Sequence, residues 1–419
     1  KYQEQRIVLS NLINSESKIL FNRNPRERVA KVAPWLTLDG DPYPAIIDGK
    51  ILWIIDGYTT SAGYPNSRVV NLANTGDALT SRSNAVLSLD DRNVNYIRNS
   101  VKATVDAYNG TVSLYQWDEK DPVLATWSKA FPGSVKPRSE ISPELLSHIR
   151  YPEDMFRVQR DILSAYHVTT ADAFYGGQDF WRVPLDPSSF GANSANQPPY
   201  YLTMQIPGQS KPTFSLYTPF VPRGGRENLT ALAVVNADAG DEYGKITVLQ
   251  LPRSTNVPGP SQVASNFEAK PEVATSLSLL RQGGADVVLG NLLTLPVGKG
   301  LLYVQPVYVR ATGNTAAYPL LQRVLVSFGD QIGFSETLQG ALDQVFGGDS
   351  GTDASNNQPN TPVNEGAGTS QAIRSAIASL QAAFSDLEAA QKRLDGAAED
   401  RARARVKAAI AALISAQNR

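Results

Sequence analysis

The 419-residue sequence contains no cysteine and only two histidines, His148 and His167. The lack of cysteine excludes disulfides, thiolate catalysis, iron–sulfur clusters and cysteine-ligated zinc. Two isolated histidines argue against a His-rich metal site and against most catalytic triads, so we expect neither a metal nor a cofactor. We interpret both as ordinary hydrogen-bonding residues.

A surplus of one charge and a long apolar run are also missing. Lys and Arg number 39 and Asp and Glu 40, which gives a net charge of -1. This balance argues against a nucleic-acid-binding protein, whose domain usually carries a basic surplus. No run approaches the ~18 apolar residues of a membrane-spanning helix. The chain begins without Met, and no signal-peptide core follows KYQEQR, so we expect a piece that starts inside a longer protein.

Apolar runs joined by tight-turn residues are the main pattern that is present. The stretch Tyr43–Tyr58 reads YPAIIDGKILWIIDGY, with Asp48-Gly49 between two apolar runs. A similar stretch, Lys102–Trp117, has Asn109-Gly110 at its centre. Because Gly accepts a positive φ in a tight turn, both stretches predict β-hairpins.

Helical and strand patterns alternate along the rest of the chain. Spacing, caps and breakers predict helices after Asn24 and at 143–148, 152–166, 261–269, 271–281 and 335–346. Strands are predicted at 200–206, 213–220, 229–237, 246–251 and 322–328, and a third hairpin has strands 286–295 and 301–310 joined at 296–300. We therefore predict an α+β fold of antiparallel hairpin-based sheets with helices packed on them, in two associated lobes.

The same patterns suggest four segments. Residues 1–140 form an N-terminal α+β lobe with two β-hairpins, and residues 141–346 form a second α+β lobe. Residues 347–369 have a single Val as their one large apolar residue and predict a flexible linker. Residues 370–419 are Ala-rich, with apolar residues at alternating four- and three-residue spacing, and predict amphipathic helices that form a helical hairpin.

Several long blocks together carry a family resemblance. They are KILWIIDGYTTSAGYP (50–65), NYIRNSVKATVDAYNGTVSLY (95–115), YPEDMFRVQRDILSAYHV (151–168), QPPYYLTMQIPG (197–208), GNLLTLPVGKGLLYVQPVYV (290–309) and QRVLVSFGDQIGFSETLQGALDQVFG (322–347). With these blocks the chain resembles the uncharacterised protein family UPF0182 of actinobacteria and cyanobacteria, over most of residues 1–347.

The resemblance implies a membrane protein. Members of this family look like multi-pass proteins with an N-terminal bundle of transmembrane helices and a large C-terminal extracytoplasmic portion, and this chain resembles that portion. It implies a place on the extracytoplasmic side of the cell membrane, with the protein's own N-terminal transmembrane region as a partner. The family has no established activity, so it supplies no catalytic residues.

Three aspartates are the candidate catalytic residues. Asp56 and Asp106 occupy equivalent positions in the two similar hairpin stretches, and Asp179 lies beside aromatic residues. Paired carboxylates can serve acid/base chemistry or bind a sugar or cation. Alternatively, the first two could fix a strand end or turn by accepting bonds from backbone N–H groups.

A short aromatic stretch gives the candidate binding residues. Tyr175 is followed by Gly-Gly-Gln and then by Asp179, Phe180, Trp181 and Arg182. Aromatic rings beside a carboxylate and an arginine can form a sugar-stacking or anion-binding site. The alternative is ordinary core packing with a surface ion pair.

Three acidic clusters lack the spacing of a calcium loop, and we expect solvated turns there. They lie at 39–41, 90–91 and 118–121. As a whole the sequence favours an extracytoplasmic binding or scaffold domain for a partner protein, an envelope glycan or lipid, or a transported component. The alternatives are an envelope hydrolase with paired carboxylates and a structural module whose terminal helices mediate assembly. An envelope protein is a further candidate partner, through residues 370–419.

Overall fold

The computed structural model describes residues 14–17, 22–75, 92–189, 195–252, 254–282, 285–298, 300–311 and 318–348, and the single residues 401, 404, 405 and 408. The chain divides into two compact units, Lys1–Thr352 and Asp353–Arg419. The elements below belong to the first unit. Nearly all of the predicted linker and terminal helices lie outside the described residues, and the division at residue 140 stays a prediction.

The first sheet contains both hairpins that the sequence predicts. Its strand order is β1-β3-β6-β7, with β2 also paired to β3, and every pairing is antiparallel. In the first hairpin Ile47 pairs with Lys50, and Asp48 and Gly49 have φ of 49° and 73°, as a type I′ turn requires. The strands are β1 (Thr37–Leu38), β2 (Tyr43–Ile47), β3 (Lys50–Ser61), β6 (Tyr96–Asp106) and β7 (Val112–Gln116).

Helices cover both faces of this sheet. Ile55 belongs to a cluster with residues of α2 (Pro25–Val32) and α4 (Pro122–Ala130), while the adjacent Ile54 packs with residues of α5 (Pro143–His148) on the other face. Alternation along β3 therefore sends successive side chains into two separate cores. Helix α2 begins as predicted: Asn24 accepts a hydrogen bond from the N–H of Arg26 at 2.9 Å. A short 3₁₀ turn, η2 (Arg138–Glu140), precedes α5.

The second sheet has the strand order β12-β11-β10-β8, with β9 paired to β10. Its core includes Leu216 and Phe220 of β10 and Phe156 of α6 (Glu153–Tyr166). The short α7 (Ala171–Gly176) follows α6, and α3 (Leu72–Thr75) lies against α6 beside the two-stranded sheet of β4 (Val70–Asn71) and β5 (Asn93–Val94). The strands are β8 (Trp181–Arg182), β9 (Tyr200–Met204), β10 (Thr213–Pro222), β11 (Ala231–Asn236) and β12 (Ile246–Gln250).

The third sheet has the order β13-β15-β16-β17, with β14 also paired to β15. The third hairpin is confirmed, because Val297 pairs with Gly300. The single strand predicted at 286–295 is wrong: the chain forms two strands, and Gly290 lies so close to β15 that an added Cβ would meet Pro306 at 2.6 Å. The strands are β13 (Ala285–Leu289), β14 (Leu293–Val297), β15 (Gly300–Ala311), β16 (Leu320–Phe328) and β17 (Gln331–Ser335).

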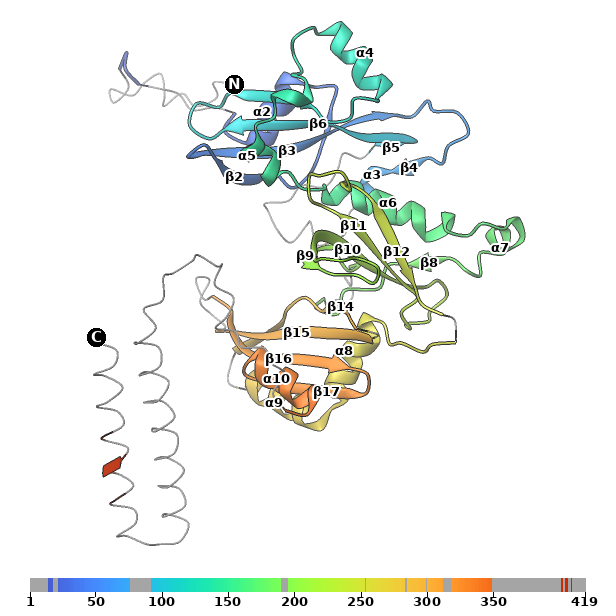
Figure 1. Ribbon diagram of the computed structural model, residues 1–419, viewed down its shortest axis with the longest axis vertical. Coiled ribbons are helices and arrows are strands. Elements are labelled where there is room, and N and C mark those ends of the chain that lie inside the picture. The colour runs from blue at the N-terminus through green and yellow to red at the C-terminus, as the bar shows by residue number, and fades with distance from the viewer. Residues whose placement is uncertain are drawn as a thin grey trace. The chain divides into compact units, whose positions relative to one another are not determined.

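Figure 1 shows these three sheets, each with helices packed against it. Helices α8 (Pro260–Ala269) and α9 (Pro271–Gln282) pack on one side of the third sheet, and α10 (Leu338–Phe346) packs on β16 and β17. The predicted α+β fold of antiparallel sheets with packed helices is thus confirmed. In the part of the chain that the structure describes, no helix combines the length and the apolar character needed to cross a membrane.

Candidate functional site

A buried ion pair lies at the centre of the first sheet. Asp56 of β3 and Lys102 of β6 are register partners, and their side chains are only 3% and 1% exposed. The Lys102 ammonium group donates to the Asp56 carboxylate, and Asn99 donates to the same oxygen at 2.8 Å. Because burying a charge without hydrogen-bond partners is very costly, these hydrogen bonds to Asp56 are what allow the ion pair to remain buried.

Lys102 also connects the first sheet to the second. Its Nζ donates to the backbone oxygen of Arg150 at 3.2 Å and to the Tyr243 hydroxyl at 2.9 Å. Arg150 precedes α6, and Tyr243 lies between β11 and β12. The Arg150 guanidinium packs over the rings of Tyr43 in β2 and Tyr201 in β9, at 4.1 and 4.5 Å. We call Asp56, Lys102, Arg150 and Tyr243 the junction network.

Burial shifts the ionisation of groups around this network. Burial lowers the pKa of the Lys102 ammonium group, although the Asp56 charge opposes the shift. Burial raises the pKa of the Asp39 carboxyl group, and repulsion from Asp154 and Asp56 raises it further. Tyr58 donates a hydrogen bond to Asp39, and its own pKa is raised by burial and then by the charge of Asp39. These carboxylates repel one another in a space with little water.

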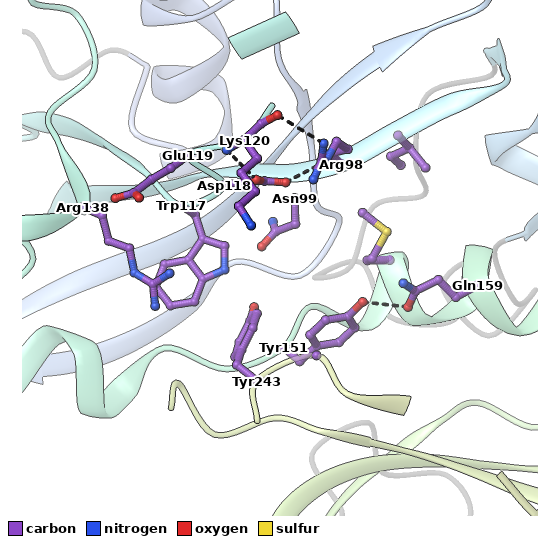
Figure 2. Close-up of a pocket in the computed structure, with 13 residues that line it drawn as sticks. Arg98, Asn99, Trp117, Asp118, Glu119, Lys120, Arg138, Tyr151, Gln159 and Tyr243 are labelled. Carbon is purple, nitrogen blue, oxygen red and sulfur yellow. Dashed lines mark hydrogen bonds and ion pairs between the residues drawn. The ribbon is translucent and has the colours of Figure 1, made fainter. Parts of the chain in front are cut away.

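A cavity of about 580 Å³ opens beside the junction network, and Figure 2 shows its lining. Asn99 and Trp117 come from the first sheet and the segment after it. Tyr151 comes from the segment just before α6, Gln159 from α6 itself, and Tyr243 from the β11–β12 connection. The charged residues of the lining are Arg98, Asp118, Glu119, Lys120 and Arg138. Residues distant in the sequence therefore form one polar cavity with aromatic walls.

Aromatic contacts hold these walls in place. Trp117 meets Tyr243 edge-on at 4.9 Å between ring centroids, and Tyr243 lies 5.3 Å from Tyr151. The Arg138 guanidinium lies 4.2 Å from the Trp117 ring centroid, and Lys102 Nζ lies 5.1 Å from it. Cations thus already occupy the Trp117 ring, so the cavity offers ring edges and polar groups more than an open stacking face.

Among the described residues that line this cavity, Asn99 has a side-chain acceptor without a partner. The side-chain oxygen of Asn99 is buried and receives no hydrogen bond from any residue that the structure describes. Asn99 orients this amide through its Nδ2, which donates to Asp56. By contrast, Gln159 accepts a hydrogen bond from the Tyr151 hydroxyl at 2.7 Å (Figure 2). A ligand with a hydroxyl or N–H donor could satisfy the Asn99 oxygen.

The three candidate catalytic aspartates lie in three different places. Asp56 is buried in the junction network, whereas Asp106 is in the β6–β7 turn and accepts bonds from the N–H groups of Tyr108 and Asn109 at 2.7 and 3.0 Å. These two bonds lower the pKa of the Asp106 carboxyl group. Asp179 lines a separate cavity next to β8. The structure therefore brings no two of these three carboxylates together.

The candidate binding residues lie in two different elements: Trp181 and Arg182 form β8, whereas Tyr175 is in α7. The Trp181 side chain is buried, and its ring stacks on that of His167 with 3.4 Å between the ring centroids. Arg182 pairs with Glu227. Both Trp181 and Arg182 line a cavity of about 650 Å³ that is rich in arginine. Tyr175 is 92% exposed at the end of α7 and belongs to neither this cavity nor that of Figure 2.

Comparison with known sequences gives the family. A family model described as "Uncharacterised protein family (UPF0182)" matches residues 1–280. This chain belongs to the UPF0182 family. It is 48% identical over 467 residues to a UPF0182 protein of Leifsonia xyli subsp. xyli, covering 100% of this chain and 47% of that protein. It is 57% identical over 351 residues to a UPF0182 protein of Thermobifida fusca, covering 83% of this chain and 34% of that protein.

A UPF0182 protein of Paenarthrobacter aurescens is 52% identical over 377 residues, covering 87% of this chain and 37% of that protein. The UPF0182 chain thus spans about a third to a half of the length of these three curated relatives. No solved structure matches it. The resemblance inferred from the sequence blocks is confirmed at the level of the family.

Solvated turns were expected at the three acidic clusters of this UPF0182 chain, and for Asp39 and Asp121 that expectation is wrong; the cluster at 90–91 lies outside the described residues. Asp39 is 3% exposed and lies among the acids beside the junction network. Asp121 is 1% exposed, caps α4 and accepts bonds from the hydroxyls of Thr59 and Ser100, each at 2.6 Å. The sequence itself indicates that Asp121 caps a helix, since Asp followed by Pro is a typical helix start.

Proposed function

We propose that this chain is the extracytoplasmic portion of a longer cell-membrane protein and that it works by binding a hydroxylated component of the cell envelope, a glycan in particular. Membership of UPF0182 and the greater length of the relatives support the first part. The lining of the Figure 2 cavity supports the second. Planar polar side chains beside aromatic rings can hydrogen-bond a sugar while packing against its apolar edges.

The observation that carries this proposal is the side-chain oxygen of Asn99, to which no residue that the structure describes donates a hydrogen bond. Leaving a buried acceptor without a hydrogen bond costs about 1–3 kcal/mol. A sugar hydroxyl would donate to this oxygen, and Gln159 and Glu119 stand in the same lining to engage neighbouring hydroxyls. Binding would then regain the free energy that the unbound protein loses by leaving the Asn99 oxygen without a hydrogen bond. This favours a ligand rich in hydroxyl donors.

Retention of envelope glycan tests this binding. The immobilised chain is exposed to a digest of purified envelope glycan, and bound fragments are quantified by mass spectrometry. Gln159→Ala and Glu119→Ala should each reduce retention roughly two- to tenfold, because each removes hydrogen bonds to the ligand. Glu140→Ala is the control, since Glu140 is exposed and outside the lining. No retention by the wild type, or an equal loss in the control, would exclude glycan binding in this cavity.

The extracytoplasmic location has its own experiment. Because the chain has no cysteine, Tyr175→Cys adds one thiol at a position that is 92% exposed. The variant is placed in the full-length protein after its other cysteines have been replaced. A membrane-impermeant maleimide should label it in intact cells. Labelling only after lysis would place this portion on the cytoplasmic side and contradict the proposal.

The other functions considered from the sequence have less support. A hydrolase needs two carboxylates on one cleft, and Asp56, Asp106 and Asp179 do not share one. Assembly through residues 370–419 stays a prediction. Deleting residues 347–419 and measuring the mass in solution tests it, and an unchanged oligomeric state would argue against it.

A further inference from the structure

A cavity of about 800 Å³ lies between helix α2 and the β6–β7 hairpin, and we call it the α2 cavity. Three cations line it: Arg23 just before the helix, and Arg28 and Lys31 within the helix. Because Arg28 and Lys31 are three residues apart, they are neighbours on one side of α2. Asp106 is the one carboxylate among the described lining residues. Three cations less one carboxylate leave a surplus of two positive charges.

Asn22 brings two of these cations together. The Arg28 guanidinium donates to the backbone oxygen of Asn22 at 3.1 Å, and the Lys31 ammonium group donates to its side-chain oxygen. The backbone of Asn22 lies in the left-handed region, with φ of 50°, which Asn tolerates better than most residues. Both of its oxygens are neutral acceptors. Two like charges are therefore held at one residue that carries no counter-charge.

The Arg28 guanidinium is also fixed from the side of the hairpin. Its Nε donates to the backbone oxygen of Gly110 at 2.9 Å. The group fills the space beside Gly110, so that a Cβ added there would lie 2.2 Å from Nη2. These bonds to two backbone oxygens use two of the five N–H donors of an arginine. The other three donors have no acceptor among the described residues.

Within the described part of the chain, carboxylates leave these cations unneutralised. No acidic residue there forms an ion pair with Arg23, Arg28 or Lys31. Glu27, the acidic residue of α2, is exposed and lies outside the cavity lining. Asp106 instead accepts hydrogen bonds from two N–H groups of its own turn. An anion from outside the protein could therefore supply the missing counter-charge.

Apolar side chains from three neighbouring strands form another part of the lining. Trp53 of β3 and Val105 of β6 are register partners, and Val105 pairs in turn with Val112 of β7. Register partners on neighbouring strands point to the same face of a sheet, so these three side chains lie side by side. Tyr108 lines the same cavity and is 70% exposed. A ligand with an apolar group next to its charge could use both parts of the cavity.

We propose that the α2 cavity binds a phosphate monoester with an apolar organic part. A monoester carries about two negative charges at neutral pH, which matches the surplus of two, whereas a carboxylate or a phosphodiester carries one. Its three terminal oxygens can accept hydrogen bonds from Arg23, Arg28 and Lys31 together. The apolar part would pack against Trp53 and Tyr108. This proposal does not depend on glycan binding in the Figure 2 cavity.

Calorimetry on the purified chain tests the proposal at neutral pH and matched ionic strength. The probes are phenyl phosphate, inorganic phosphate, and phenyl sulfate, which has the same shape as phenyl phosphate but a single charge. We expect phenyl phosphate to bind, inorganic phosphate to bind more weakly, and phenyl sulfate to bind at least tenfold more weakly.

A separate arm distinguishes a soluble ester from a lipid headgroup, since both can present a terminal phosphate. It uses vesicles of phosphatidic acid, whose phosphate is a monoester, and of phosphatidylglycerol, whose phosphate is a diester. Binding to phosphatidic acid vesicles without binding to phenyl phosphate would identify the lipid as the source.

Variants connect the binding to the cavity. Lys31→Gln and Arg23→Gln should each weaken phosphate binding about tenfold, because each removes a charged hydrogen-bond donor. Lys129→Gln is the matched control: Lys129 is also an exposed lysine in the last turn of a helix on the first sheet, but it lies outside the lining. Tyr108→Ser should weaken the binding of phenyl phosphate and leave that of inorganic phosphate unchanged. An unchanged melting temperature without ligand shows that each variant folds.

Three results would overturn the proposal. The first is an absence of binding to both phenyl phosphate and phosphatidic acid. The second is an affinity for phenyl sulfate or phosphatidylglycerol equal to that for the matching monoester. The third is a loss of affinity in Lys31→Gln no greater than that in Lys129→Gln. Loss of phosphate binding in Lys31→Gln should leave glycan retention unchanged, which separates this site from the one proposed above.

Discussion

The variant Lys102→Met tests the junction network most directly. Met keeps much of the length and apolar character of the lysine stem but removes the ammonium group. Asp56 would then be a buried carboxylate held by Asn99 alone among the contacts described above. The Arg150 backbone oxygen would lose one donor but keep the bond from the Tyr243 hydroxyl at 3.3 Å. The main cost is therefore that of an unpaired buried charge.

Removing one partner of a buried ion pair typically costs about 3–5 kcal/mol. We expect Lys102→Met to lower the free energy of unfolding by that amount, measured by urea denaturation with tryptophan fluorescence. The slope of the free energy against urea should stay unchanged, since the native surface is preserved. The double variant Lys102→Met/Asp56→Asn should recover about 2 kcal/mol of the loss, because the amide no longer carries a charge.

An exposed pair provides the matched control. Lys245 and Glu242 are 64% and 58% exposed, so Lys245→Met should change the stability by well under 1 kcal/mol. A loss of stability in Lys102→Met no greater than that in Lys245→Met would show that the buried pair does not stabilise the native state. A double variant without recovery would show that the loss does not come from the Asp56 charge.

Three further substitutions probe separate features. Burial and then repulsion from Asp154 raise the pKa of Asp39, so the native state keeps a proton that the unfolded chain loses above about pH 4. The melting temperature should therefore fall as the pH rises from about 4 through the pKa that Asp39 has in the native state. In Asp39→Asn this fall of the melting temperature with pH should be absent. Asp121→Ala should cost about 2–4 kcal/mol in urea denaturation, because the helix cap and the buried acceptor of three hydroxyls are lost together. Gly333→Ala should cost about 2 kcal/mol or more by the same assay, because its Cβ would lie 2.0 Å from the backbone oxygen of Ala341.

Two of these substitutions have a control variant. Asp121→Asn retains a capping oxygen and should cost less than Asp121→Ala. Gly329→Ala meets no atom within 4 Å, so only its φ of 58° opposes the substitution, at a cost of about 1 kcal/mol. A cost for Gly333→Ala no greater than that of Gly329→Ala would show that α10 does not pack closely on β17. A pH slope that persists in Asp39→Asn would assign it to another group.

The hairpins could be predicted because their determinants are local. Asp48-Gly49 needs positive φ at both positions, and the apolar runs on each side have few other ways to pair. The break between β13 and β14 could not be predicted in the same way. Gly290-Asn291 interrupts the apolar run and is a typical signal for a break. The sequence does not show, however, that Gly290 lies close to Pro306, which is the contact that an added Cβ would disturb.

The charged interior was harder to predict for the same reason. Asp56 and Asp106 are equivalent in the sequence pattern, yet one is buried against Lys102 and the other caps a turn. The difference comes from the second sheet, because Tyr243 covers Lys102 and keeps water from the pair. The sequence of a single hairpin does not show which residues from other parts of the chain will pack against it. Likewise, Trp181 and Arg182 were recognised as candidates, but the arginines that surround them come from elsewhere in the chain.

The Figure 2 cavity is physically linked to the buried acids through Asp56. Asn99 lines the cavity and donates a hydrogen bond to Asp56. The charge of Asp56 is one of the causes that raise the pKa of Asp39. A glycan that binds to the side-chain oxygen of Asn99 should therefore shift the pH dependence assigned to Asp39. An identical fall in stability with and without the glycan fragment would show that the cavity and the acids act independently.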